Sequence, residues 1–254
     1  KVKQFKSSIN NTCIVSVVND SFFEYFIVFA RSILEHNQFF NFDWLIYYGS
    51  EKGCLNDENK KNMEDAYNNI KFIKVNEGKY SKFNNLVPGN LFASLFKLDL
   101  FNLSKYKKIV CLDVDTLCLG DISDLFKFDY YLAASIAGGD YNKHLIQQGY
   151  FKRIYNFNAG ILIYGEKIIK DNIYQKLLNY NKYAEFAEQT ILNSFFKFTP
   201  KYLLPFKYNF HATLFKDYIE ENDVRILHYA GPKPTKEPNL PQMKYWLKAK
   251  RTYT

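Results

Sequence analysis

Residues 107–120 read KKIVCLDVDTLCLG, an apolar run that ends at two carboxylates, Asp113 and Asp115. The run predicts a buried strand, and side chains two positions apart on a strand point to the same face. Ligands of α/β proteins bind at the ends of such strands. Two neighbouring anions there repel each other unless a cation joins them, which favours a divalent metal ion that also holds phosphate oxygens. The alternative is an acidic pair that only caps the strand and begins a turn.

Strand-like and helix-like segments alternate along the rest of the chain. Apolar and β-branched runs predict strands over 12–19, 43–49, 70–75, 131–137, 159–164 and 224–228. Helices are predicted over 22–36, 56–69, 91–103, 166–180, 184–195 and 242–251. This alternation indicates one α/β domain with a mainly parallel central sheet flanked by helices. Asp20 is expected to cap the first helix, and the lack of a G-x-G-x-x-G or P-loop motif after it argues against a dinucleotide fold.

The composition is that of a folded protein. With 254 residues, of which 47% are apolar and 19% aromatic, the chain has enough core-forming residues to argue against disorder. No apolar segment approaches the roughly 18 to 20 residues that cross a membrane. The start, KVKQFKSSINN, lacks an initiating Met and a long apolar signal region, which indicates a trimmed or partial chain. Four cysteines without C-x-x-C spacing favour a reducing compartment, so we expect a cytoplasmic protein.

A basic C-terminal segment, residues 236–254, follows a main domain of residues 1–235, and the net charge of the chain is +8. Such a segment suits an anionic partner: a phosphorylated ligand, an acidic lipid surface or a nucleic acid. With Tyr245, Trp246 and Leu247 it predicts a helix on the inner face of an anionic membrane; a solvated helix end is the alternative. We expect no nucleic-acid partner, because the aromatic residues mostly have core spacing and no RNA-binding fingerprint occurs.

Two further groups of residues carry side chains of the kinds that can bind a ligand. Asn158 precedes Ala159 and Gly160 at a predicted strand start, where small residues let a ligand approach the backbone; a plain turn is the alternative. Glu188 and Gln189 lie on a predicted helix beside its apolar face. They either reach a pocket or belong to a solvated helix surface.

The segment 228–234, HYAGPKP, places a His at a strand end before a rigid Gly/Pro loop. His228 is a fitting ligand for a borderline divalent ion such as Mn²⁺ when carboxylates supply the other ligands. Lys233 would neutralise a phosphate as a point charge. Together with Asp113 and Asp115, this segment suggests one metal–diphosphate site.

The order and spacing of these pieces resemble glycosyltransferase family 8, the retaining enzymes that include glycogenin and bacterial lipopolysaccharide galactosyl- and glucosyltransferases. The similar blocks are the Asn19-Asp20 loop, SLFKLDLFNLSKYKKIVCLDVDTL, FNAG, EQTILN, and HYAGPKP followed by KYWLKAKRT. The resemblance implies a GT-A fold with a Rossmann-like nucleotide-binding half. It also implies transfer of a hexose (galactose, glucose or N-acetylhexosamine) from a UDP-sugar to a glycan or glycolipid acceptor in lipopolysaccharide or surface glycan synthesis.

The resemblance further implies roles for individual residues. Asp113, Asp115 and His228 would bind Mn²⁺ or Mg²⁺, while Glu188 and Gln189 would lie close to the anomeric carbon. The donor-binding residues would be Asn19, Asp20, Phe22, Lys97, Asp113, Val114, Asn158, Ala159, Gly160, Gly231 and Lys233. Because an amide oxygen is barely basic, Gln189 is a poor nucleophile. We therefore expect same-face attack assisted by the leaving phosphate.

The sequence departs from the family pattern at several places. Glu188 replaces the usual Asp, Phe22 replaces the Tyr of glycogenin, and the final loop is one residue shorter. Thr235 stands where Trp is usual. Ala137 aligns with a family carboxylate, although Asp140 lies three residues on. These differences leave the donor sugar and the acceptor unnamed.

Two alternative functions stay open. A haloacid-dehalogenase-type phosphatase also carries a hydrophobic strand followed by D-x-D-x-T, with Asp113 as nucleophile, Asp115 as acid/base and Mg²⁺. Its motif normally lies on an early strand and is followed by a second acidic motif, whereas here it lies at mid-chain without one. The other alternative is a protein glycosyltransferase of family 8.

Overall fold

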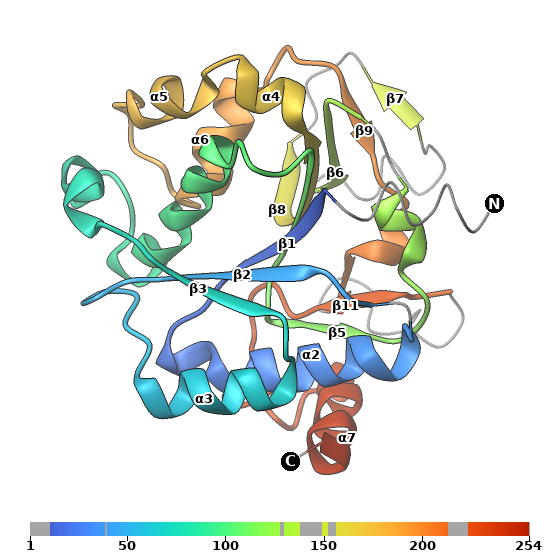
Figure 1. Ribbon diagram of the computed structural model, residues 1–254. Coiled ribbons are helices and arrows are strands. Elements are labelled where there is room, and N and C mark those ends of the chain that lie inside the picture. Colours follow the sequence, from blue (N-terminus) through green and yellow to red (C-terminus); the bar gives the residue numbers. More distant parts are fainter. Residues whose placement is uncertain are drawn as a thin grey trace.

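A central β-sheet with helices on both faces is the framework of the protein in the computed structural model (Figure 1). The structure describes residues 11–38, 40–127, 130–137, 149–151, 156–212 and 223–253. The strands of the larger sheet lie in the order β3 (Ile70–Lys74), β2 (Asp43–Tyr48), β1 (Thr12–Val17), β4 (Lys108–Leu112), β8 (Phe157–Gly165), β6 (Leu132–Ile136), β9 (Lys201–Leu203) and β7 (Gly149–Phe151). A smaller sheet has the order β10 (Phe210–His211), β11 (Ile226–His228) and β5 (Thr116–Cys118). The predicted α/β class is confirmed.

The first half of the larger sheet, from β3 to β4, is parallel throughout. Strands β1 and β4 are buried on both faces, which is why they read as almost continuous apolar runs. Parallel neighbours end at the same edge of a sheet. The loops that follow β1 and β4 therefore lie at one edge, which is where ligands of α/β proteins bind.

The second half of the fold is mixed and returns the chain to that edge. Strand β8 is antiparallel to both β4 and β6, and β9 is parallel to β6. In the smaller sheet β11 pairs antiparallel with β5, so that His228 lies opposite Thr116. This pairing brings the end of β11 beside the turn that joins β4 to β5.

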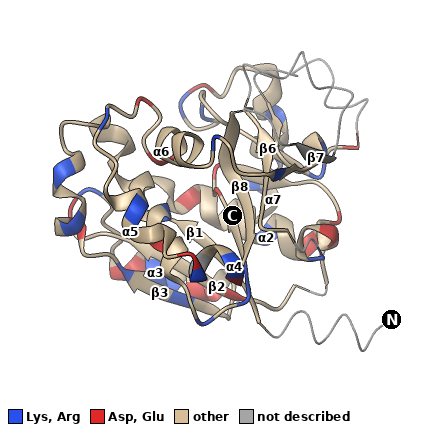
Figure 2. Cartoon of the chain, turned by 90° about the horizontal axis from the view of Figure 1, so that it is seen from above, with Lys and Arg blue, Asp and Glu red and all other residues tan. Residues whose placement is uncertain are grey.

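Helices from distant parts of the sequence cover the two faces of the sheet (Figure 1). On one face lie α2 (Phe23–His36), α3 (Asp57–Ala66) and α7 (Lys244–Tyr253). On the other lie η3 (Gly89–Asn102), α4 (Glu166–Lys170), α5 (Ile173–Leu178) and α6 (Glu188–Phe195). In Figure 2 the strands β6 and β8 carry almost no charge, whereas α3 and α5 carry charged residues.

The segment predicted as a helix over 91–103 forms 3-10 turns instead of an α-helix. Its apolar residues are not confined to one side, and Phe92, Leu95, Phe96 and Phe101 are buried. No side chain caps its first turn. Packing against the sheet, α5 and α6 therefore decides its conformation in place of helical spacing and capping.

Two other predicted helices are shorter than expected. The segment 166–180 divides into α4 and α5 at Asn172, whose φ of 51° interrupts the helix. The segment 184–195 becomes helical only at Glu188, because Ala187 has a φ of 42°. The strands β9 and β10 were not predicted, since two or three residues are too few to show a period.

The C-terminal helix α7 packs against α2. Trp246 is fully buried, with its ring centroid 5.2 Å from that of Tyr25, and Lys250 forms an ion pair with Glu24. The prediction that Trp246 contacts a membrane surface is therefore wrong, because its ring belongs to the core. Among the described residues no helix combines the length and the apolar character that a membrane crossing requires.

Candidate active site

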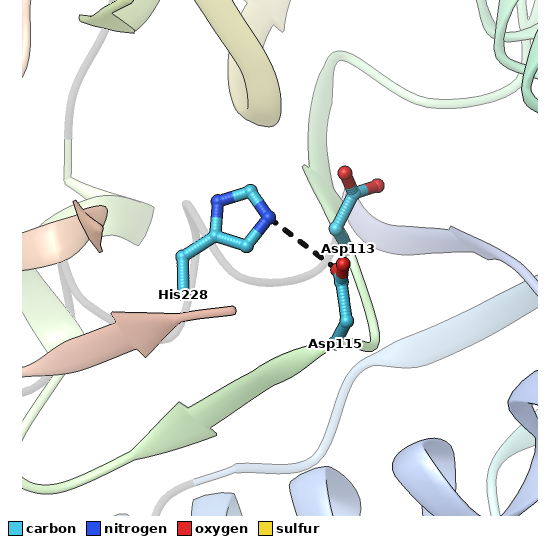
Figure 3. A group of neighbouring side chains, drawn as sticks. All are labelled: Asp113, Asp115 and His228. Atoms are coloured by element: carbon cyan, nitrogen blue, oxygen red, sulfur yellow. Dashed lines mark ion pairs between the residues drawn. The ribbon is translucent and has the colours of Figure 1, made fainter. Parts of the chain in front are cut away.

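Asp113, Asp115 and His228 come together at the edge where β4 ends, and Figure 3 shows the imidazole pointing from β11 toward Asp115. One potential ligand atom from each side chain lies within 4.8 Å of the other two. The strand β4 ends at Leu112, so both carboxylates lie on the turn between β4 and β5. The expectation that they share one strand face is wrong, yet the turn still brings both of them to His228.

Backbone contacts fix the position of this turn. The Asp113 N–H donates to Gly160 O at 2.8 Å, and the Tyr229 N–H donates to Asp115 O at 2.9 Å. Gly160 also makes room for His228, because a Cβ at residue 160 would lie 2.4 Å from the ring carbon Cε1. Gly160 was predicted to let a ligand approach the backbone. In the structure it is the ring of His228 that approaches the backbone there.

Two basic side chains hold Asp115. Lys233 Nζ lies 2.7 Å from Asp115 Oδ2, and His228 Nε2 lies 3.4 Å from Oδ1. Burial alone would raise the pKa of Asp115, but His228 and Lys233 outweigh that effect and hold the pKa well below its usual range. Asp115 is therefore anionic at neutral pH and offers hard oxygen ligands.

Lys97 bridges two acidic side chains in the interior. Its ammonium lies 2.6 Å from Asp113 Oδ1 and 2.9 Å from Glu188 Oε1, and it donates to Ala159 O at 3.3 Å. Burial lowers the pKa of Lys97, but the two anions reverse this and raise it well above the ordinary value. Burial also raises the pKa of Glu188; Lys97 opposes the rise and Asp113 adds to it. One cation between two carboxylates leaves a net negative charge, which suits the binding of a second cation.

The contacts of Glu188 distinguish between the two predicted positions of its side chain, in a pocket or on a solvated helix surface. Its side chain is buried against Lys97, so it does not belong to a solvated helix surface. Lys97 itself directs its three N–H groups at protein oxygens. It therefore positions Asp113 and Glu188.

Neutral amides form the other side of the site. Gln189 Oε1 accepts from Asn158 Nδ2 at 3.0 Å and from the Ala159 N–H at 3.0 Å. Asn158 Oδ1 in turn accepts from the Gly160 N–H at 2.9 Å. Strand β8 thus positions Asn158 and, through it, the first turn of α6.

Asn209 is a residue of this site that sequence reasoning missed. It is fully buried between the 3-10 turn η6 (Phe206–Tyr208) and β10. Its Nδ2 donates to Asn158 Oδ1 at 2.9 Å, and its Oδ1 lies 2.7 Å from His228 Nδ1. A two-residue strand after a single turn has no periodicity, so no signal in the sequence singles this residue out.

The Asn19-Asp20 loop lies at the same sheet edge, after β1. Asn19 caps the following turn by accepting from the Phe22 N–H at 3.1 Å, so the expectation that Asp20 is the cap is wrong. Asp20 Oδ1 instead accepts from the Asn56 N–H at 2.9 Å and from Asn59 Nδ2 at 2.8 Å. Burial raises the pKa of Asp20, but these hydrogen bonds outweigh it and lower the pKa. Asp20 therefore fastens the loop to the start of α3.

The loop after β11 carries the remaining predicted residues. Gly231 has a φ of 100°, a conformation that favours glycine. Lys233 Nζ donates to Tyr229 O at 2.7 Å, which holds its ammonium close to Asp115. Val114, between the two carboxylates, is buried. Asp140 lies outside the residues that the structure describes.

Known proteins resemble this chain over most of its length. The sequence model of Glycosyl transferase family 8 matches residues 13–237. Human glycogenin-1 is 25% identical over 187 residues, which cover 70% of this chain and 49% of glycogenin-1. Glycogenin-1 of Caenorhabditis elegans is 24% identical over 186 residues, covering 68% of this chain and 39% of that protein. The chain thus spans less than half the length of these two relatives.

Solved structures share the fold. The galactosyltransferase LgtC, in complex with donor and acceptor sugar analogs, superposes with a TM-score of 0.69 at 20% identity, covering 95% of this chain and 96% of that chain. The glycosyltransferase GlyE of Streptococcus pneumoniae gives a TM-score of 0.66 at 20% identity, covering 94% and 60%. The predicted GT-A fold is confirmed, and the family match gives the phosphatase alternative no support.

Proposed function

The chain belongs to glycosyltransferase family 8, and we propose that it transfers a hexose from a UDP-sugar to a hydroxyl of a glycan or glycolipid, with retention at the anomeric carbon. The observation that carries this proposal is the cluster of Asp113, Asp115 and His228 at the carboxyl edge of the parallel strands. Carboxylate and imidazole ligands together suit Mn²⁺, with Mg²⁺ as the alternative.

The residues of the cluster fit a divalent ion in charge as well as in donor chemistry. Their ligand atoms converge within 4.8 Å, and Asp115 is held in its anionic form. The ammonium of Lys97 is shared between Asp113 of this cluster and Glu188, so one positive charge faces two carboxylates. A bound ion would supply Lewis-acid neutralisation of the charge that builds on the departing UDP, an effect of several kcal/mol.

Lys233 is placed to bind the same diphosphate. Its ammonium lies beside the metal ligands, on Asp115, and can exchange this carboxylate for a phosphate oxygen as the leaving group forms. Gly231 precedes it in an exposed position, with no atom within 4 Å of where a Cβ would lie. This open backbone leaves room for a phosphate.

Gln189 supports a mechanism without a covalent protein intermediate. Two N–H groups, from Asn158 and Ala159, occupy its Oε1, so the oxygen is not available to attack the anomeric carbon. The amide N–H₂ group is the part left to bind the donor sugar. The acceptor hydroxyl then attacks from the face that UDP leaves, and its proton passes to the departing phosphate oxygen.

Donor hydrolysis tests this function without a known acceptor. Galactose is the first sugar to test, because LgtC is a galactosyltransferase, and UDP-glucose and the two UDP-N-acetylhexosamines complete the panel. We expect Mn²⁺-dependent release of UDP from one donor, abolished by a chelator and restored by added Mn²⁺. A panel without any Mn²⁺-dependent hydrolysis would contradict the proposal. Release of phosphate from simple phosphomonoesters would support the phosphatase alternative instead.

The partner proposed for the C-terminal helix is an anionic membrane that carries a lipid-linked acceptor. Lys244, Lys248 and Arg251 follow one another at helical spacing and are exposed. With Leu247 and Thr252 they line a hollow of about 340 Å³. Because Trp246 is buried, this basic stripe would bind through charge and not by insertion of aromatic rings.

Vesicle co-sedimentation tests the membrane partner. We expect binding to vesicles with anionic lipid, and loss of binding when Lys244, Lys248 and Arg251 are all changed to Glu. The control is the triple change of Lys167, Lys170 and Lys176 to Glu, which alters the net charge equally on the opposite face of the sheet. Equal loss in both variants, or no loss in the first, would contradict a binding role for this stripe.

A further inference from the structure

Asn209 connects His228 with Asn158 through hydrogen bonds in which the donor and the acceptor are fixed. Its side chain is fully buried and lies between Asn158 and His228. His228 is a ligand of the proposed metal ion, and Asn158 holds Gln189. The Asn209 amide therefore contacts both the metal ligand His228 and Asn158, the residue that positions Gln189.

Backbone N–H groups fix the orientation of these amides. The Gly160 N–H can only donate, so the Asn158 atom that it contacts at 2.9 Å must be the oxygen. That oxygen also faces Asn209, which must present its N–H₂ group there. The oxygen of Asn209 is then the atom that lies 2.7 Å from His228 Nδ1.

The contact with Asn209 also determines which ring nitrogen of His228 carries the hydrogen. An amide oxygen can only accept, so His228 Nδ1 carries the hydrogen. In the neutral ring the lone pair then resides on Nε2, the nitrogen that faces Asp115. A metal ligand needs this free lone pair, and hydrogen bonds to the other ring nitrogen hold the required tautomer.

We propose that Asn209 is a positioning residue that fixes the Nδ1–H tautomer of His228 for metal binding and, through Asn158, the orientation of the Gln189 amide. This inference rests on the proposed metal-dependent function. The last of these hydrogen-bonded amides is Gln189. The Ala159 N–H can only donate, so the Gln189 atom that it contacts must be the oxygen. Two backbone donors on β8 thus impose one orientation on every amide between Gln189 and the metal ligand.

Truncation of Asn209 separates this role from ordinary packing. We expect Asn209→Ala to weaken Mn²⁺ binding to the nucleotide-free protein about 10- to 100-fold, the range for loss of a residue that orients a metal ligand. The readout is the fraction of free Mn²⁺ in an electron paramagnetic resonance titration. Asn37→Ala is the matched control, because Asn37 is an equally buried amide whose bonds to Ile33 O and the Ile122 N–H lie outside the site.

Both variants are expected to lower the melting temperature, but only Asn209→Ala should change Mn²⁺ affinity. Equal Mn²⁺ affinities in wild type, Asn209→Ala and Asn37→Ala, with both variants less stable, would show that Asn209 is structural only and would overturn the proposal. If wild type binds no Mn²⁺ either alone or with UDP, the proposed function fails, and that outcome is distinct from equal affinities among the three proteins.

The substitution Asn209→Asp separates the two contacts of the side chain. A carboxylate still accepts from His228 Nδ1–H but cannot donate to Asn158 Oδ1. We expect Mn²⁺ affinity at or above the wild-type level, with donor hydrolysis slowed about tenfold. Loss of Mn²⁺ affinity as large as in Asn209→Ala would overturn the assignment of Nδ1–H to this contact.

A measurement on the unmodified protein completes the test. A long-range ¹H–¹⁵N spectrum of the histidine rings, with His228 assigned by its disappearance in His228→Gln, reports which ring nitrogen carries hydrogen. We expect a proton on Nδ1 of His228. A ring with hydrogen on Nε2 and none on Nδ1 would overturn the proposal even if every Asn209 variant failed to fold.

Discussion

Two sides of the candidate site are built from different chemistry. The charged side consists of Lys97, Asp113, Asp115, Glu188 and Lys233, in which ammonium groups hold carboxylates. The amide side consists of Asn158, Gln189, Asn209 and His228, in which amide groups are joined by hydrogen bonds to one another and to the imidazole. The charged side comes largely from the parallel half of the sheet and the segment before β4, whereas the amide side comes from the mixed half.

Ligand binding must break ion pairs on the charged side, whereas the hydrogen bonds of the amide side can stay as they are. Asp113 Oδ1 faces Lys97 and Asp115 Oδ2 faces Lys233, so a metal ion must compete with these ammonium groups for the two oxygens. A diphosphate must instead compete with Asp115 for the ammonium of Lys233. The amide side already presents His228 and Gln189 in one orientation. We therefore expect changes on the charged side to act through the charge at the metal and the diphosphate, and changes on the amide side to act through the orientation of His228 and Gln189.

The largest effect is expected from Asp115→Asn on the charged side. Loss of this anionic ligand removes the Lewis-acid effect, and at about 1.4 kcal/mol for each factor of ten we expect donor hydrolysis to fall about a thousandfold. Asp121→Asn is the control, since Asp121 is exposed and accepts from Ser123 away from the site. Hydrolysis near the wild-type rate in Asp115→Asn would show that the reaction does not depend on a metal ion bound by this carboxylate.

The next largest effect concerns Lys97, which keeps two buried carboxylates together. Removing one partner of a buried ionic group costs about 3–5 kcal/mol, so we expect Lys97→Met to lower the free energy of unfolding by that amount in urea. The double variant Lys97→Met/Glu188→Gln should recover part of the loss, because one of the unpaired charges is gone. If the double variant is as unstable as the single one, the carboxylate of Glu188 is not the partner that matters.

Gly160 tests the amide side by steric means. A Cβ at this position meets the His228 ring at 2.4 Å, so Gly160→Ala must displace the imidazole, and we expect Mn²⁺ affinity to fall about 10- to 100-fold. Gly165→Ala on the same strand is the matched control, since a Cβ there meets no atom closer than 3.7 Å. Equal affinities in the two variants would mean that the ring does not need this space to bind the metal.

The smallest effect is expected at Lys233, and it has opposite signs for two ligands. A hydrogen bond to a charged group contributes about 1.5 kcal/mol, so Lys233→Gln should strengthen Mn²⁺ binding without nucleotide by roughly tenfold. Binding of UDP should weaken instead, because a cation next to the phosphates is lost. Calorimetric titration with each ligand measures both, and weaker binding of Mn²⁺ would show that Lys233 does not compete for Asp115.

The two sides also differ in how far the sequence predicts them. A buried strand that ends at Asp113 and Asp115 is a local pattern, and the loop after His228 is another, so their residues could be named. The bridge made by Lys97 could not be predicted, because the apolar residues of η3 are not confined to one side and its conformation follows from packing. Asn209 has no pattern around it, and the direction of an amide depends on partners that only the folded chain brings together.

The central claim is that His228 and the two aspartates hold a metal ion against a UDP diphosphate. Electron–nuclear double resonance of Mn²⁺ bound to the chain with UDP, in protein labelled with ¹⁵N-histidine, tests it most directly. We expect couplings of the same Mn²⁺ ion to a histidine nitrogen and to phosphorus, with the nitrogen coupling absent in His228→Gln. Mn²⁺ that couples to phosphorus but to no histidine nitrogen would contradict it.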